Sequence, residues 1–201
     1  MNPEHAKRLF LALLNGYTLR LRLAWTSRSF ASSVCSRELL EANLSDFLSS
    51  ACAKLRQQQS VAGRFVAFAS TSRFINNEMS HAIVAQVVMP VPTSNVQEML
   101  GYMLEEVRGQ WRQGAEYKRA GVYLTNIVAS EAAQQDFFDE RDREKDDRLQ
   151  HALDSLNNRY GKNQVRFAVQ SSADEREKTF RLEHLSPRYT THLDEVMVVK
   201  I

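Results

Sequence analysis

The segments RFVAFAST (residues 64–71) and HAIVAQVVM (residues 81–89) follow one another in the sequence and are rich in Val, Phe, Ile and Ala. Each is shorter than a typical helix and consists largely of residues that favour strands. The turn-prone pair Asn76-Asn77 lies between them. They are therefore predicted to form two consecutive strands of one sheet.

An amphipathic helix is predicted on either side of this pair of strands. Ser36 can cap the first helix, whose apolar positions recur at steps of three and four residues. Pro90 and Pro92 are expected to end the second strand, and Ser94 with Gln97 forms a capping box for the second helix. The apolar positions are Leu40, Leu44, Phe47, Leu48, Ala51 and Leu55 in the first helix, and Val96, Met99, Leu100, Met103, Val107 and Trp111 in the second.

Two outer strands complete the predicted sheet. From Leu19 to Phe30, apolar residues up to Trp25 alternate with a basic face that carries Arg20 and Arg22, which is typical of a half-buried strand. The segment from Arg119 to Ile127 alternates in the same way. The resulting order, βαββαβ, predicts an α+β fold of the split βαβ type, a four-stranded sheet with two helices on one face. The other face of the sheet is left open for binding.

Composition limits the function classes. The chain has 201 residues, with 43% hydrophobic and 25% charged residues and only 7 Gly and 4 Pro, which is typical of a globular protein rather than a collagen-like, mucin-like or disordered one. With 26 basic and 24 acidic residues, any site for a polyanion must come from local clustering. Two distant cysteines, Cys35 and Cys52, fit a reducing, cytoplasmic location, and no stretch approaches the roughly 20 apolar residues of a membrane-spanning helix.

The ends of the chain differ from its centre. The basic start before Leu9 imitates a signal peptide, but six apolar residues without a cleavage site favour a short helix that ends at Gly16 over secretion. After Val128 the chain becomes charged, and a helix is predicted from about Glu140 to Asn158, ended by Gly161 and followed by a possible strand at residues 165–169. We expect an N-terminal helical extension (1–17), a sheet domain (18–128), and a linker with a charged helix and an extended tail (129–201).

No residue pattern predicts catalysis, a metal site or a cofactor. The chain lacks a glycine-rich phosphate loop and any zinc-ligand spacing, and its five histidines lie far apart in sequence. The adjacent carboxylates Asp146-Asp147 and Asp194-Glu195 point away from each other on a helix or tail and are expected to be solvated.

Two basic elements could hold a phosphate. Ser27, Arg28 and Ser29 are expected in a loop after the first strand, where hydroxyls, a guanidinium and backbone N–H groups suit a phosphate oxygen. Lys118 and Arg119 open the last strand, which lies beside the first strand in a split βαβ sheet. Ordinary solvated surface charge is the simpler interpretation of both elements.

A third element is aromatic. Gln134, Asp136, Phe137 and Phe138 lie in a segment without helical periodicity, so the two rings either anchor a docking peptide in a partner's pocket or fold back onto the domain.

Four motifs resemble, in order and spacing, the C-terminal half of the UmuC family, the catalytic subunits of the bacterial Y-family translesion polymerase V. The resemblance covers about Ala24 to Ile201. The motifs are Ser27-Arg28-Ser29-Phe30, Tyr117-Lys118-Arg119-Ala120-Gly121-Val122, Gln134 to Phe138, and Leu185-Ser186-Pro187-Arg188-Tyr189-Thr190-Thr191.

The resemblance implies the little-finger domain of Y-family polymerases, with a role in translesion synthesis and SOS repair. Ser27, Arg28, Ser29, Lys118 and Arg119 would then hold the backbone of primer-template or damaged DNA without reading its sequence. The segment from Gln134 to Phe138 would be the sliding-clamp-binding peptide, although Gln135 stands where a hydrophobic residue is usual. UmuD-type subunits are further implied partners.

In the family, the carboxylates of the palm and fingers hold two magnesium ions, and nothing in Met1 to Arg22 resembles these domains. This chain is therefore expected not to polymerise. It is expected to be a truncated or rearranged fragment. Two alternatives remain. One is an interaction module that competes for the clamp or for polymerase V partners without useful DNA binding. The other is an RNA-recognition domain, but neither Gly63 to Phe68 nor His81 to Met89 carries its Gly-aromatic pattern.

Overall fold

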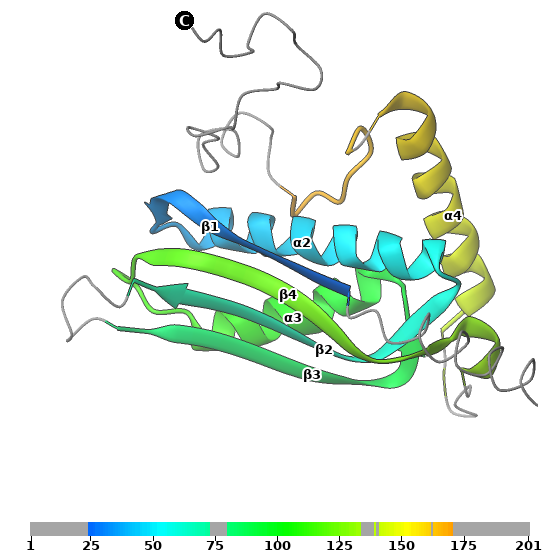
Figure 1. Cartoon of the computed structure of the whole chain (residues 1–201), viewed down its shortest axis with the longest axis horizontal. Coiled ribbons are helices and arrows are strands. Elements are labelled where there is room, and N and C mark those ends of the chain that lie inside the picture. Colours follow the sequence, from blue (N-terminus) through cyan, green and yellow to red (C-terminus); the bar gives the residue numbers. More distant parts are fainter. Residues whose placement is uncertain (1–23, 73–79, 134–138, 140, 162, 171–201) are drawn as a thin grey trace, which may run out of the picture.

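The computed structural model describes residues 24–72, 80–133, 139, 141–161 and 163–170 (Figure 1). The predicted order βαββαβ is confirmed, and a further helix follows it. The predicted N-terminal helix, the start of the first strand at residues 19–23, Asn76-Asn77 and the C-terminal tail lie outside the described residues. The elements are β1 (Ala24–Val34), α2 (Arg37–Gln57), β2 (Ser60–Thr71), β3 (Ala82–Thr93), α3 (Val96–Gln110), β4 (Tyr117–Ala129), a 3-10 turn (Ser130–Ala132) and α4 (Arg143–Tyr160).

The sheet consists of two interleaved split βαβ units. Its strand order is β1-β4-β2-β3, and every neighbouring pair is antiparallel. Strands β1 and β2, joined by α2, are therefore parallel to each other with β4 between them, and β3 and β4, joined by α3, are parallel with β2 between them. Both helices cover one face of the sheet (Figure 1). The predicted fold class and the adjacency of the first and last strands are confirmed.

The core lies between the sheet and these two helices. Ser36 caps α2 by accepting a hydrogen bond from the Leu39 N–H, as predicted, and every apolar position expected for α2 is buried. The same holds for α3, except that Trp111 is half-buried just beyond the helix, where its ring packs 5.2 Å from that of Tyr117. The alternation on β4 buries Ala120, Val122 and Leu124 against the helices, which leaves the intervening residues on the opposite face.

The end of β3 and the start of α3 differ from the prediction. The strand continues through Pro90 and Pro92 to Thr93, because β3 is an edge strand, where a residue without an N–H costs no ladder bond on the solvent side. The helix cap is Asn95 rather than Ser94, since the Asn95 side chain accepts the bond from the Glu98 N–H. The predicted capping box is therefore wrong by one residue.

The orientation of β1 also differs from the prediction. Trp25 was expected on the buried face, but its side chain is 56% exposed, and Phe30 on the opposite parity is buried. The strand continues four residues past its expected end, to Val34, and contains an irregularity between Ser29 and Val34. Residues 27–29 therefore lie within a strand and not in a loop, so neighbouring side chains point to opposite faces.

Helix α4 packs beside the C-terminal end of α2 (Figure 1). It spans residues 143–160 and ends at Gly161, close to the prediction. Residues 163–170 form turns and not the expected strand, and Phe167 and Val169 pack against the core there. Among the residues that the structure describes, no helix has the length and apolar character needed to cross a membrane.

Candidate nucleic-acid interface

The face of the sheet opposite α2 and α3, here called the open sheet face, is built from rows of directly paired residues. Since paired residues on neighbouring strands point to the same face, each row runs across the sheet with its side chains together. The first row is Ser29, Arg119, Ser70 and Ala82; the second is Ser27, Gly121, Phe68 and Val84; the third is Trp25, Tyr123, Val66 and Gln86; the fourth is Thr125, Arg64 and Val88.

The first row places one guanidinium between two hydroxyls. Arg119 pairs with Ser29 of β1 on one side and with Ser70 of β2 on the other. Its side chain is exposed and makes no hydrogen bond or ion pair with the described residues. Neighbouring strands are about 4.8 Å apart, so donors from three strands lie within the reach of one phosphate group.

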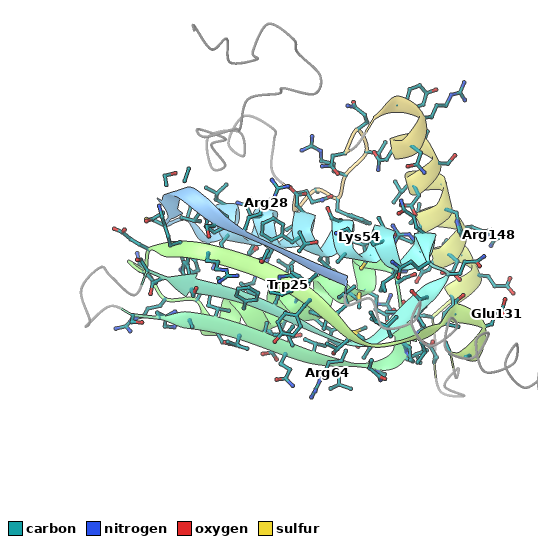
Figure 2. All side chains as sticks on the ribbon, viewed as in Figure 1. Trp25, Arg28, Lys54, Arg64, Glu131 and Arg148 are labelled. Carbon is teal, nitrogen blue, oxygen red and sulfur yellow. The ribbon has the colours of Figure 1, made fainter. Side chains whose placement is uncertain are left out.

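The sequence prediction grouped Arg28 and Lys118 with this row, but the structure separates them from it. Arg28 pairs with Ala120, which is fully buried against the helices, so Arg28 belongs to the other face of β1. Figure 2 places its label beside α2, whereas Trp25 is labelled over the strands and Arg64 at the lower edge of the sheet. The predicted group of five therefore becomes Ser27, Ser29 and Arg119 on the open sheet face, with Arg28 elsewhere.

Lys118 has a structural partner. Its ammonium donates a 2.7 Å hydrogen bond to the backbone carbonyl of Ala31, within the irregular part of β1. Because that irregularity removes Ala31 from the regular ladder, the lysine satisfies a carbonyl that would otherwise rely on water. Lys118 thus holds the edge of the sheet, and its charge is less available to a ligand than that of Arg119.

The open sheet face is positively charged without any acidic side chain. Arg64 is the one exposed residue in the first eight positions of β2, and it pairs with Thr125 of β4 and with Val88 of β3. No Asp or Glu occurs in the four rows defined above, so Arg64 and Arg119 are not neutralised from within them. A local cationic surface therefore exists although the net charge of the chain is only +2.

The same face carries aromatic rings. Trp25 pairs directly with Tyr123, and the Tyr123 ring lies 6.3 Å from the ring of Phe68. Gly121 lets the strands approach closely beside them, because a Cβ atom there would lie 2.4 Å from the Ser27 Cβ and 2.8 Å from the Phe68 ring. We call Trp25, Tyr123 and Phe68 the aromatic patch.

The predicted clamp-binding residues, Gln134, Asp136, Phe137 and Phe138, lie outside the described residues, but the chain on both sides of them is attached to the domain. On one side, the Ser130 N–H donates a 3.0 Å hydrogen bond to the Gln59 carbonyl. On the other, Arg143 lies 3.4 Å from Glu98, whose side chain is 4% exposed.

Ion pairs hold α4 to the domain. The hydrogen bond from Arg143 lowers the pKa of Asp139 below its ordinary range, and Arg143 also lies 3.4 Å from Glu98 of α3. Arg56 of α2 makes a bidentate pair with Asp154, with N–O distances of 2.6 and 2.7 Å. It also donates to the Ser94 carbonyl at 2.8 Å.

Sequence reasoning missed Arg64, Ser70, Tyr123 and Phe68. The available signal was parity: Arg64, Phe68 and Ser70 all occupy even-numbered positions of one predicted strand, and Tyr123 lies on the face of the last strand opposite its apolar residues. The pairing of β2 with β4 brings Ser70 beside Arg119. It is a contact between distant segments, so no local sequence pattern predicts it.

The chain is similar in sequence to known proteins over most of its length. Residues 25–137 match the C-terminal domain of the impB/mucB/samB family, which covers more than half of the chain. The chain belongs to this family. Residues 147–199, which include most of α4, match a domain of unknown function (DUF4113).

The relatives include protein UmuC of Salmonella typhimurium, 30% identical over 175 residues, and protein ImpB of Salmonella typhimurium, 28% identical over 176 residues. Each alignment covers 87% of this chain and 41% of the relative, so the chain spans about two fifths of the length of these proteins. The resemblance to the C-terminal part of the UmuC family is thereby confirmed. A solved complex of the beta-clamp processivity factor with the little finger domain of Pol IV is similar at 15% identity, with a TM-score of 0.37, covering 60% of this chain and 95% of that one.

Proposed function

We propose that this chain is a DNA-binding module of translesion synthesis and SOS repair that holds primer-template or damaged DNA by its phosphate backbone. The observation that carries the proposal is the cationic open sheet face, whose four rows contain no Asp or Glu. On this face Arg119 lies between Ser29 and Ser70, and Arg64 lies two strands away from the edge strand β1. Membership of the impB/mucB/samB family supports the same role.

The chemistry of the open sheet face suits binding that ignores sequence. Phosphate contacts from guanidinium and hydroxyl groups fix a protein on DNA but carry no base information, whereas base-edge hydrogen bonds would fail on a damaged template. The open sheet face presents guanidinium and hydroxyl groups from neighbouring strands, which are side chains that contact phosphate. It therefore fits a protein that must hold DNA whose bases are altered.

The proposal includes docking on the bacterial sliding clamp through Gln134, Asp136, Phe137 and Phe138, and UmuD-type subunits as further partners. It also includes the absence of polymerase activity from this chain, because the family match covers the C-terminal domain. The support for clamp docking is the resemblance of the segment and the attachment of Ser130 and Arg143 to the domain on either side of it. The alternative is an interaction module that uses this segment alone.

Fluorescence anisotropy with a labelled primer-template tests the proposal. Two variants, Arg119→Ala and Arg64→Ala, each remove one cation from the open sheet face, and Arg148→Ala removes an exposed cation from α4 as a matched control. Three or four phosphate contacts predict a log-log salt slope of about −3, and each face variant should reduce its magnitude by about 0.9. The control should leave the slope unchanged.

Two outcomes contradict parts of the proposal. A folded protein, judged by circular dichroism, that binds no DNA even at low salt would leave only the interaction module. Replacement of Phe137 and Phe138 by Ala should abolish clamp binding and leave DNA binding intact. If clamp binding survives in that variant, the docking peptide is not where the sequence predicts it.

A further inference from the structure

The aromatic patch is not needed for holding a phosphate backbone, and it lies on the face that is open to solvent. Trp25 is 56% exposed on the edge strand β1, although a tryptophan side chain is ordinarily among the largest contributors to a core. Its neighbour across the strands is Tyr123, whose ring in turn lies 6.3 Å from that of Phe68. Three aromatic residues from three adjacent strands thus lie on one face of the sheet.

Cations flank this surface on two sides. Arg119 is four residues from Tyr123 along β4, about 13 Å, in the direction of the first row. Arg64 lies two strands from Trp25 and one row away, at about 12 Å. A single strand of nucleic acid that crosses the patch could therefore place phosphates near both guanidinium groups while its bases lie over the rings.

We propose that the aromatic patch stacks the unpaired bases of single-stranded DNA, so that the open sheet face takes the single-stranded part of a template. This inference rests on the proposed function, which it deepens by naming the form of DNA. Aromatic rings stack on every base, so such a site tolerates sequence and damage as the phosphate contacts do. The two arginines and the lack of carboxylates in the four rows favour a polyanion over a basic or neutral protein surface as the occupant, and the aromatic rings add a surface on which bases can stack.

The test uses the full chain with two labelled probes, a twelve-nucleotide oligo(dT) and a blunt duplex of the same length. Trp25→Ala should weaken oligo(dT) binding by about 5- to 150-fold, the loss expected for one stacked base, and change duplex binding less than about twofold. Trp25→Phe keeps a ring and should keep most of the affinity. Tyr102→Ala removes an exposed ring from α3 on the helical layer and should change neither affinity.

Intrinsic fluorescence gives an independent reading of stacking. The chain has two tryptophans, and the second, Trp111, packs against Tyr117. Saturating oligo(dT) should quench the wild-type emission and leave that of Trp25→Phe, in which only Trp111 remains, nearly constant.

The outcomes separate this inference from the proposed function. If Arg119→Ala weakens duplex binding while Trp25→Ala binds oligo(dT) like the wild type, the stacking site is wrong and the DNA-binding role stands. If neither probe binds at low salt, both fail. If sedimentation shows a dimer that Trp25→Ala converts to a monomer, the patch is an interface between copies of the chain and the stacking site is overturned.

Discussion

Gly121 on β4 offers a direct test of how closely the strands of the open sheet face approach. A Cβ atom at this position would lie 2.4 Å from the Ser27 Cβ and 2.8 and 2.9 Å from two atoms of the Phe68 ring. Carbon atoms in contact are normally about 3.5–4.0 Å apart, so the added Cβ atom is too close by about 1.1 Å on the Ser27 side and about 0.7 Å on the Phe68 side. The two sides differ in how they can respond.

The Phe68 contacts are at the far end of a side chain, which can tilt. The Ser27 contact is with a Cβ atom fixed to the β1 backbone, so the strand itself must move. Overpacking of this kind costs about 1–3 kcal/mol, and we expect Gly121→Ala to lower the free energy of unfolding by about 2 kcal/mol. At about 3 °C per kcal/mol for a domain of this size, the melting temperature should fall by about 6 °C.

Thermal and urea denaturation measure this change. The control is Gly101→Ala on α3, which has no atom within 4 Å of the added Cβ and should raise stability by about 0.5–1 kcal/mol, because alanine is the better helix former. Ser27→Gly in the Gly121→Ala background should recover part of the loss. If Gly121→Ala stays within the ~0.5 kcal/mol of an ordinary surface substitution, the argument from close approach is wrong.

Three further predictions concern the ion pair on α4, the core thiol and the sheet edge. Asp154→Asn removes the negative charge and one of the two acceptor oxygens that pair with the Arg56 guanidinium, which is 10% exposed. Stability should fall by about 1–3 kcal/mol, and hydrogen exchange of α4 amides should accelerate while that of the sheet is retained. Unchanged exchange would mean that packing holds α4. Burial raises the pKa of Cys52 to about 12, so a thiol reagent should label only Cys35 in the folded protein. Stability should fall as the pH rises above 9.0, the ordinary pKa of the thiol, because the unfolded chain ionises first. Rapid labelling of both thiols would contradict this prediction. Lys118→Met removes one hydrogen bond from the β1 edge and should lower the free energy of unfolding by about 1 kcal/mol. It should weaken DNA binding less than Arg119→Ala does. If it weakens DNA binding more, Lys118 belongs to the binding site.

The sequence predicts element type and order well where the pattern is long and local. The apolar steps of α2 and the Ser36 cap identify a helix from neighbours within four residues, and both are found as expected. The strand end that was predicted wrongly depends instead on long-range structure. Pro90 and Pro92 terminate a central strand but are tolerated in β3 because it lies at the edge, and strand order is a long-range property.

The candidate site was harder to predict than the fold, because an alternating strand can face either way. The apolar run up to Trp25 suggested a buried face, yet the pairing of β1 with β4 puts Phe30 in the core and Trp25 in solvent. A shift of one residue exchanges the two faces, and this shift removed Arg28 from the predicted cluster. The loop expected at Ser27 to Ser29 had the right polar composition but lies within a strand.

Arg119 and the residue that leads into the predicted clamp-binding segment lie towards opposite ends of β4. Arg119 lies near the start of β4, whereas Ala129, which leads into the predicted clamp-binding segment, ends it ten residues later, about 33 Å away along the strand. Beyond a distance of about 10 Å, substitutions usually act independently when they share no partner. A variant that combines Arg119→Ala with changes at Phe137 and Phe138 should therefore show the sum of the two single effects on each ligand. A marked departure from that sum would require that the two surfaces touch a common partner, as they would if clamp and DNA were bound at the same time.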